Sequence, residues 1–132
     1  MNELHYLTLS AGLTFVMVIT ASLIRNRGHT PRGAIQAMGN RDEVLTATPL
    51  SGRADRAALN MLENLVIFTA LLLSARAAGV ASTLLTQAAA LFFFARVGYF
   101  GVYLAGLKVL RSALWGVGVA AMVMLVYGTF SV

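Results

Sequence analysis

The chain has 132 residues, of which 58% are hydrophobic and 11% are charged. Soluble domains carry roughly 25% charged residues, so this composition would leave a soluble protein with much of its apolar surface in water. An ordinary soluble monomer is therefore excluded. Ten Lys and Arg residues against five Asp and Glu residues give a formal charge of +5. The chain has no cysteine for a disulfide or thiolate nucleophile, and its two histidines are too few to suggest a metal site.

Four segments are long and apolar enough to cross a bilayer. A spanning helix needs about 20 residues, because the hydrocarbon core is about 30 Å thick and a helix rises about 1.5 Å per residue. The predicted spans cover residues 4–24, 56–78, 83–105 and 111–130. A long polar segment, 25–55, joins the first two spans, whereas the later connections are short enough to require antiparallel neighbours. We therefore predict an all-α integral membrane protein in which residues 1–132 form one four-helix transmembrane domain.

The distribution of basic residues predicts how the chain is oriented in the membrane. Lys and Arg accumulate in cytoplasmic loops. Eight of the ten fall on the side of segment 25–55, namely Arg25, Arg27, Arg32, Arg41, Arg53, Arg56, Lys108 and Arg111. Arg76 lies on the opposite side, and Arg96 lies inside the third span. We expect segment 25–55 to be cytoplasmic with both termini across the membrane, and we attribute the positive charge to this topology rather than to nucleic-acid binding.

Two stripes of polar side chains occur within the predicted spans. They comprise Arg56, Asn60 and Glu63 on the second span, and Arg96, Tyr99 and Tyr103 on the third. Spacings of three and four residues place each set on one helix face. Polar groups at membrane depth cost free energy unless they find partners. Guanidinium groups, an amide, a carboxylate and two phenols at one depth suit a small zwitterionic or anionic ligand, since Arg binds carboxylates in a bidentate manner.

The same residues also suit purely structural roles. Glu63 and Arg96 have opposite charges at comparable depth, so they are expected to form at least in part an intramembrane pair that fixes helix register. Arg53, Arg56 and Arg111 are also placed to act as interfacial anchors that extend toward lipid phosphates.

Three segments resemble the MAPEG superfamily of membrane-associated proteins in eicosanoid and glutathione metabolism. Residues 53–64, RADRAALNMLEN, resemble the R-x-x-R-A-x-x-N-x-x-E signature of its second helix. Residues 95–103, ARVGYFGVY, resemble the A-R-x-x-Y-x-x-x-Y pattern of its third helix, and residues 110–115, LRSALW, are similar to the start of its fourth. Together with the four spans and the long first loop, the resemblance covers essentially the whole chain.

The resemblance implies a homotrimer that binds glutathione as co-substrate between neighbouring subunits, in a cavity open to the cytoplasm. The implied glutathione-binding residues are Arg53, Arg56, Asn60, Glu63, Arg96, Tyr99 and Tyr103, with Arg25 or Arg27 at the end of the first helix. Arg111 corresponds to the arginine beside the thiol. Ser112 is either a hydrogen-bond donor to that thiol or a helix N-cap.

The implied activity is that of a glutathione-dependent transferase or peroxidase acting on a lipophilic electrophile. Ala58 stands where some members have glutamine or histidine, and Asn64 where eicosanoid enzymes have tyrosine, which favours a general transferase or a non-catalytic relative. The chain resembles a bacterial-type member similar to microsomal glutathione transferases, and we expect it in a bacterial inner membrane. Two alternatives stay open at this point. One is a small four-helix transporter, although such proteins need an embedded acid in the first helix, where this chain has none after Glu3. The other is a non-catalytic MAPEG-like membrane protein.

Overall fold

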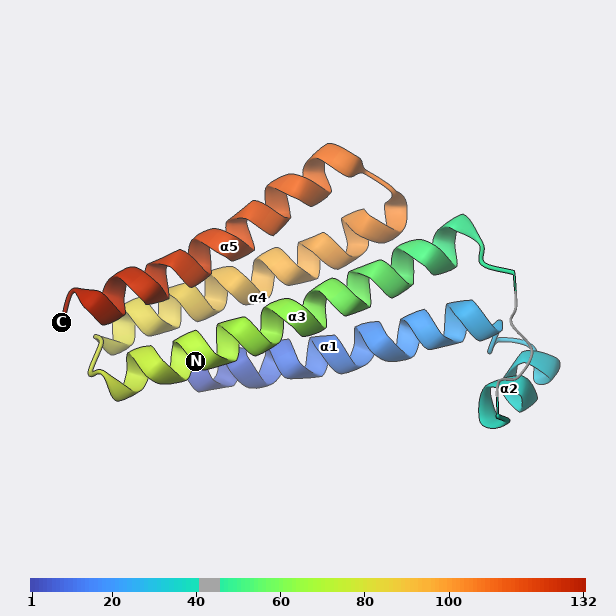
Figure 1. The fold of residues 1–132 in the computed structure, drawn as a ribbon, viewed down its shortest axis with the longest axis horizontal. Helices are drawn as coiled ribbons and strands as arrows, with labels where there is room; N and C mark the ends of the chain where they lie inside the picture. Colours follow the sequence, from blue (N-terminus) through green and yellow to red (C-terminus); the bar gives the residue numbers. More distant parts are fainter. Residues whose placement is uncertain (41–45) are drawn as a thin grey trace.

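Four long helices and one short helix make up the computed structural model, which describes residues 1–40 and 46–132. They are α1 (Glu3–Asn26), α2 (Pro31–Met38), α3 (Pro49–Ala77), α4 (Ser82–Ala105) and α5 (Lys108–Phe130). The long helices run side by side, and α2 lies beyond one end of the bundle (Figure 1). All four are long and apolar enough to span a membrane, which confirms the prediction of an all-α protein with four spans.

Two of the long helices begin earlier than the apolar pattern predicted. Helix α3 starts at Pro49 because Thr48 and Ser51 form a reciprocal capping box, with Ser51 N donating to Thr48 Oγ1 at 3.1 Å and Thr48 N donating to Ser51 Oγ at 2.9 Å. Its first two turns are polar, so hydropathy alone does not reveal them. Helix α5 starts at Lys108, directly after Gly106 ends α4 with a φ of +79°. Glycine adopts this left-handed conformation without steric cost, so the turn between the two helices can be very short.

Helices α3 and α4 form the centre of the bundle, since each packs against the other three long helices. Within the described parts of the chain, α1 and α5 are the two long helices that do not touch each other. The Phe68 ring of α3 stacks on the Phe92 ring of α4 with centroids 4.0 Å apart. Buried alanines on both helices, among them Ala57 and Ala88, permit this close approach.

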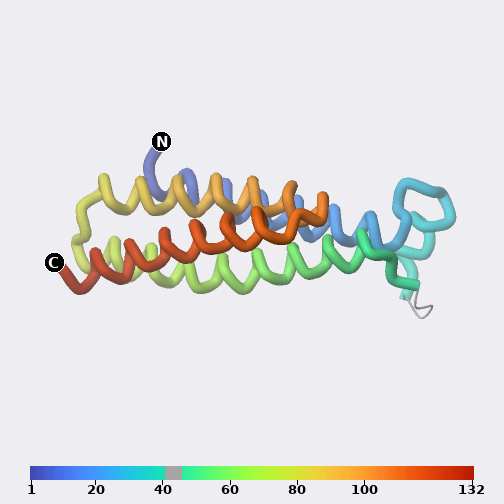
Figure 2. The backbone as a smooth tube through the Cα atoms, turned by 90° about the horizontal axis from the view of Figure 1, so that it is seen from above, coloured from blue at the N-terminus to red at the C-terminus, as the bar shows by residue number. Residues whose placement is uncertain are grey.

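The two ends of the bundle differ in charge. Both termini lie at the end opposite α2 (Figures 1 and 2), where buried Glu3 accepts hydrogen bonds from Arg76 and Thr86 and so joins α1 to α3 and α4. The other end, hereafter the basic end, carries Arg25, Arg27, Arg32, Arg53, Arg56, Lys108 and Arg111. Arg41, which was also assigned to this side, lies outside the described residues. The clustering of the basic residues agrees with the predicted antiparallel order of the spans.

Candidate functional site

A cavity of about 250 Å³ opens at the basic end between α3, α4 and α5. Its lining consists of Pro49, Arg53, Arg56, Tyr103, Gly106, Lys108 and Arg111. Four of these residues are cationic, and the described lining contains no carboxylate. Because like charges at close range repel one another, such a cavity favours an anionic occupant.

Contacts between helices hold the arginines of the cavity in place. Arg56 Nε donates to the Tyr103 hydroxyl oxygen at 3.3 Å, which joins α3 to α4. Arg53 Nε donates to the Leu104 carbonyl oxygen at 3.1 Å, near the end of α4. Neither arginine forms an ion pair with any described residue. Their positions are therefore fixed, while no carboxylate in the described parts of the chain neutralises their charges.

A second cavity, of about 280 Å³, adjoins the first and is lined by Tyr99, Tyr103, Arg111, Ser112 and Trp115. Tyr103 and Arg111 belong to both cavities, and the Arg111 guanidinium carbon lies 5.0 Å from the centroid of the Tyr103 ring. This cation–π contact orients Arg111 without cancelling its charge. A ligand that occupies the first cavity would thus extend past Tyr103 and Arg111 into the second cavity, whose lining has more aromatic rings.

Ser112 is not the N-cap of its helix, so that alternative is wrong. The N-cap position belongs to Leu107, because the helix begins at Lys108 instead of 111. The Ser112 hydroxyl donates to the Lys108 carbonyl oxygen at 3.1 Å, one turn earlier in α5. Its proton is therefore engaged within the helix, although the residue does line the second cavity.

The expected pairing of Arg96 with Glu63 is also wrong. Arg96 is fully buried, and its guanidinium donates from Nη1 to Asn60 Oδ1 at 3.1 Å and from Nη2 to Asn64 Oδ1 at 2.7 Å. Successive residues of an α-helix point about 100° apart, so Asn64 faces α4 and Glu63 does not. In the described parts of the chain, ion pairs join Arg25 to Asp55 and Arg76 to Glu3, and Glu63 takes part in neither.

Glu63 instead lies on the outer face of α3. The side chains around it on this face are Leu59, Leu62, Val66 and Ile67, all exposed and apolar. A carboxylate at this depth would be costly against lipid.

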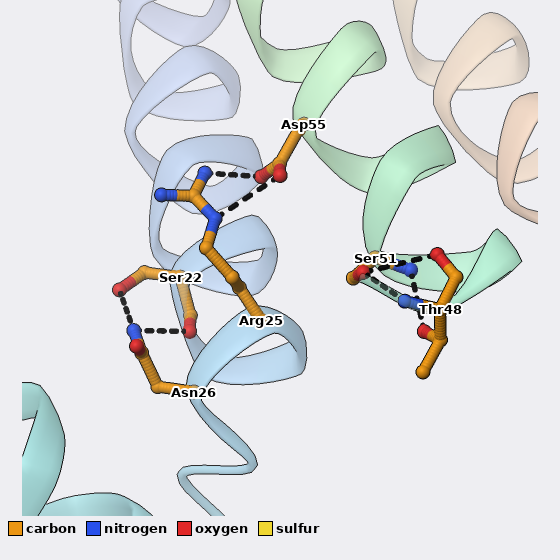
Figure 3. Close-up of polar contacts among 6 residues, drawn as sticks. All are labelled: Ser22, Arg25, Asn26, Thr48, Ser51 and Asp55. Atoms are coloured by element: carbon orange, nitrogen blue, oxygen red, sulfur yellow. Dashed lines mark hydrogen bonds and ion pairs between the residues drawn. The ribbon is translucent and has the colours of Figure 1, made fainter. Parts of the chain in front are cut away.

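Arg25 does not line either cavity. Its guanidinium forms an ion pair with Asp55 on α3, using both Nε and Nη2 (Figure 3). The neighbouring Asn26 Nδ2 donates to the Ser22 carbonyl oxygen at 2.9 Å, within α1. The ion pair holds the end of α1 against the start of α3 and leaves Arg25 with a partner within its own protomer.

Sequence reasoning missed two contributors to the site. Lys108 lines the first cavity, but it falls in the segment assigned to a connection. Asn64 was noted only as a departure from a family pattern, whereas in the structure it holds Arg96. Its spacing of four from Asn60 was the available signal, because residues four apart share a helix face.

The family model that matches this sequence is that of the MAPEG family, over residues 4–131. The match covers nearly the whole chain and extends over all five helices except the first residue of α1. No curated protein matches the sequence closely enough to serve as a relative.

Proposed function

The chain belongs to the MAPEG family, and on this premise we propose that it is a membrane-bound, glutathione-dependent transferase or peroxidase. The observation that carries the proposal is the cavity at the basic end, which has four cationic side chains and no described carboxylate. Glutathione is a tripeptide with two carboxylates and one ammonium group, so its net charge complements this lining. Arg53, Arg56 and Lys108 supply donors for the carboxylates.

Arg111 is placed to activate the thiol. A free thiol has a pKa of about 8.5, and the thiolate is the nucleophile. Lowering that pKa to about 6.5 requires about 2.7 kcal/mol of preferential stabilisation of the thiolate. A guanidinium about 4 Å away contributes about 4 kcal/mol at an effective dielectric constant of about 20. One oriented arginine is therefore sufficient, and the protein needs no nucleophile of its own.

The reaction follows from this arrangement. The thiol proton passes to water at the basic end, and the thiolate sulfur attacks the electrophilic carbon of a lipophilic substrate. A carbon–sulfur bond forms while the leaving group departs with its electron pair. With a lipid hydroperoxide, the thiolate sulfur instead attacks the terminal peroxide oxygen, so that an S–O bond forms while the O–O bond breaks and the lipid alkoxide leaves and takes up a proton from water. The thiol of a second glutathione then attacks the sulfenic sulfur, which gives glutathione disulfide and water. The second cavity is lined by the aromatic rings of Tyr99, Tyr103 and Trp115, against which such substrates would pack.

We propose further that the working form is a homotrimer. The apolar outer face of α3 around exposed Glu63 supports this, because a second copy would remove the carboxylate from lipid. The Glu63 carboxylate would then form an ion pair with the ammonium group of a ligand bound in the neighbouring subunit's cavity. The proposed topology places the basic end on the cytoplasmic side of an inner membrane.

The test is a titration of the detergent-solubilised protein with glutathione by calorimetry, followed by ultraviolet absorbance of the thiolate in the complex. We expect saturable binding and a thiolate signal at neutral pH, where free glutathione is mostly protonated. Absence of binding would overturn the proposal. Binding without conjugation of any lipophilic electrophile would instead indicate a non-catalytic member.

A further inference from the structure

Asn60 carries a hydrogen-bond donor that no described residue uses, one helical turn along α3 from the cationic cavity. The residue is partly exposed and lies one helical turn beyond Arg56, which lines that cavity. Its Oδ1 accepts from Arg96 Nη1 at 3.1 Å. In residues 1–40 and 46–132, no hydrogen bond involves Asn60 Nδ2, and this atom is not among the fully buried polar atoms. The amide nitrogen is therefore available to a ligand.

Arg96 determines which end of the Asn60 amide faces outward. A guanidinium can only donate hydrogen bonds, so it holds the amide oxygen toward itself and leaves the NH₂ group free. Arg96 has little freedom to rotate away. Its guanidinium carbon lies 5.1 Å from the Phe92 ring centroid and 5.4 Å from that of Tyr99, and a Cβ at Gly118 would lie only 2.9 Å from Nη2.

Asn64 completes this arrangement from the other side. Its Nδ2 donates to the Asn60 carbonyl oxygen at 2.7 Å, so its Oδ1 must turn toward α4, where it accepts from Arg96 Nη2 at 2.7 Å. The backbone of α3 thus orients Asn64, Asn64 and the surrounding rings orient Arg96, and Arg96 orients Asn60. Each amide has a single orientation that satisfies its partners.

We propose that Arg96 and Asn64 are positioning residues that hold the Asn60 Nδ2 group toward the bound tripeptide, so that the site selects a carboxylate at this point. A donor held there attracts a carboxylate oxygen and rejects the ammonium group of a ligand bound in the reverse direction. The inference rests on the proposed glutathione site and adds to it the direction in which the peptide lies. If Asn60 served only as a hydrogen-bond partner of Arg96, replacing its Nδ2 group would not change the affinity for glutathione.

The substitution Asn60→Asp separates these two roles. An aspartate still accepts from Arg96, and as a charged group it does so more strongly, but it presents an oxygen to the ligand in place of a donor. We expect at least a tenfold loss of glutathione affinity by calorimetry, with no fall in the thermal midpoint in detergent. Asn64→Asp is the control, because it places a carboxylate against the same guanidinium on the side away from the cavity; since it also removes the donor to the Asn60 carbonyl oxygen, its thermal midpoint is measured in parallel. We expect its affinity to stay within threefold of the wild type.

Asn64→Leu tests the positioning step. Without its second partner, Arg96 no longer holds the Asn60 amide in one orientation, so we expect the affinity to fall three- to tenfold. The Asn64→Asp control restores the acceptor and should restore the affinity. An equal loss in both variants would indicate that Asn64 only supports packing, and would overturn its positioning role.

Two glutathione analogues, each with one carboxylate converted to a primary amide, identify the selected group. For one of the two analogues, we expect Asn60→Asp to bind less than threefold more weakly than the wild type does. The aspartate oxygen accepts a hydrogen bond from the new amide of that analogue. The selectivity would be overturned if Asn60→Asp binds glutathione as tightly as the wild type, or if its loss is the same for all three ligands. Failure of the wild type to bind glutathione at all would instead overturn the proposed function, and this inference with it.

Discussion

Arg111 lies with its guanidinium carbon 5.0 Å from the centroid of the Tyr103 ring, and these two side chains form the wall common to both cavities. Arg111 comes from the first turn of α5 and Tyr103 from the last turn of α4, on either side of the turn at Gly106. The ring orients the guanidinium, yet no described carboxylate pairs with it. A cation that is held in place without a described anion is suited to stabilise a thiolate between the cationic cavity and the aromatic one.

Arg111→Ala is expected to suppress formation of the thiolate. Without the guanidinium, the pKa of bound glutathione should rise by about 2 units toward that of a free thiol. The measurement is the ultraviolet thiolate absorbance of the complex as a function of pH. Lys108→Ala is the control, because Lys108 lines only the first cavity. A titration that is unchanged in Arg111→Ala would remove this residue from the proposed role.

Arg56→Ala is expected to weaken glutathione binding. A hydrogen bond to a charged group contributes about 1.5–3 kcal/mol, which corresponds to a loss of about tenfold to a hundredfold in affinity. Calorimetry in detergent measures it directly. Arg32→Ala provides the comparison, since Arg32 is exposed on α2 away from the cavities. Equal affinities for the two variants would contradict the placement of the ligand at the basic end.

Glu63→Ala is expected to reduce glutathione affinity about tenfold, by the same charge-assisted bond strength. In the isolated protomer Glu63 is exposed and lies outside both cavities, so a loss of binding requires a neighbouring subunit. Native mass spectrometry in detergent should give the mass of three chains for both proteins. Ser74→Ala, exposed on the same helix, is the control. A monomeric wild type, or full retention of binding in Glu63→Ala, would refute the proposed intersubunit role.

Gly118→Ala is expected to destabilise the bundle, because a Cβ at this position would lie 2.9 Å from Arg96 Nη2 and 3.1 Å from Nε. The guanidinium is buried and held by two asparagines, so it cannot move without breaking those bonds. Overpacking of this kind costs about 1–3 kcal/mol. Gly116→Ala is the matched control on the same helix, since a Cβ there meets nothing within 4 Å. Similar unfolding midpoints in detergent for both variants would contradict this view of the packing.

Much of the architecture could be predicted from the sequence. The four spans follow from long apolar segments, and the clustering of Arg53, Arg56, Lys108 and Arg111 follows from antiparallel helices joined by short turns. These properties are local, because the hydrophobicity of a segment and the length of a connection do not depend on distant residues. The first residues of α3 and α5 were harder to predict from the sequence. They are determined by the Thr48–Ser51 capping box and by the left-handed conformation of Gly106, and not by hydropathy.

The tertiary structure alone decided how each helix is rotated about its axis. Arg56, Asn60, Glu63 and Asn64 are equally compatible with several rotations of α3, and neighbouring residues differ by only about 100° in direction. Packing of α3 against α4 turned Asn60 and Asn64 toward Arg96 and left Glu63 on the outer face. The sequence by itself therefore determined that this is a four-span membrane protein with polar groups at one depth. Which of those groups are partners depends on helix rotation, which is set by side-chain packing between segments distant in the chain.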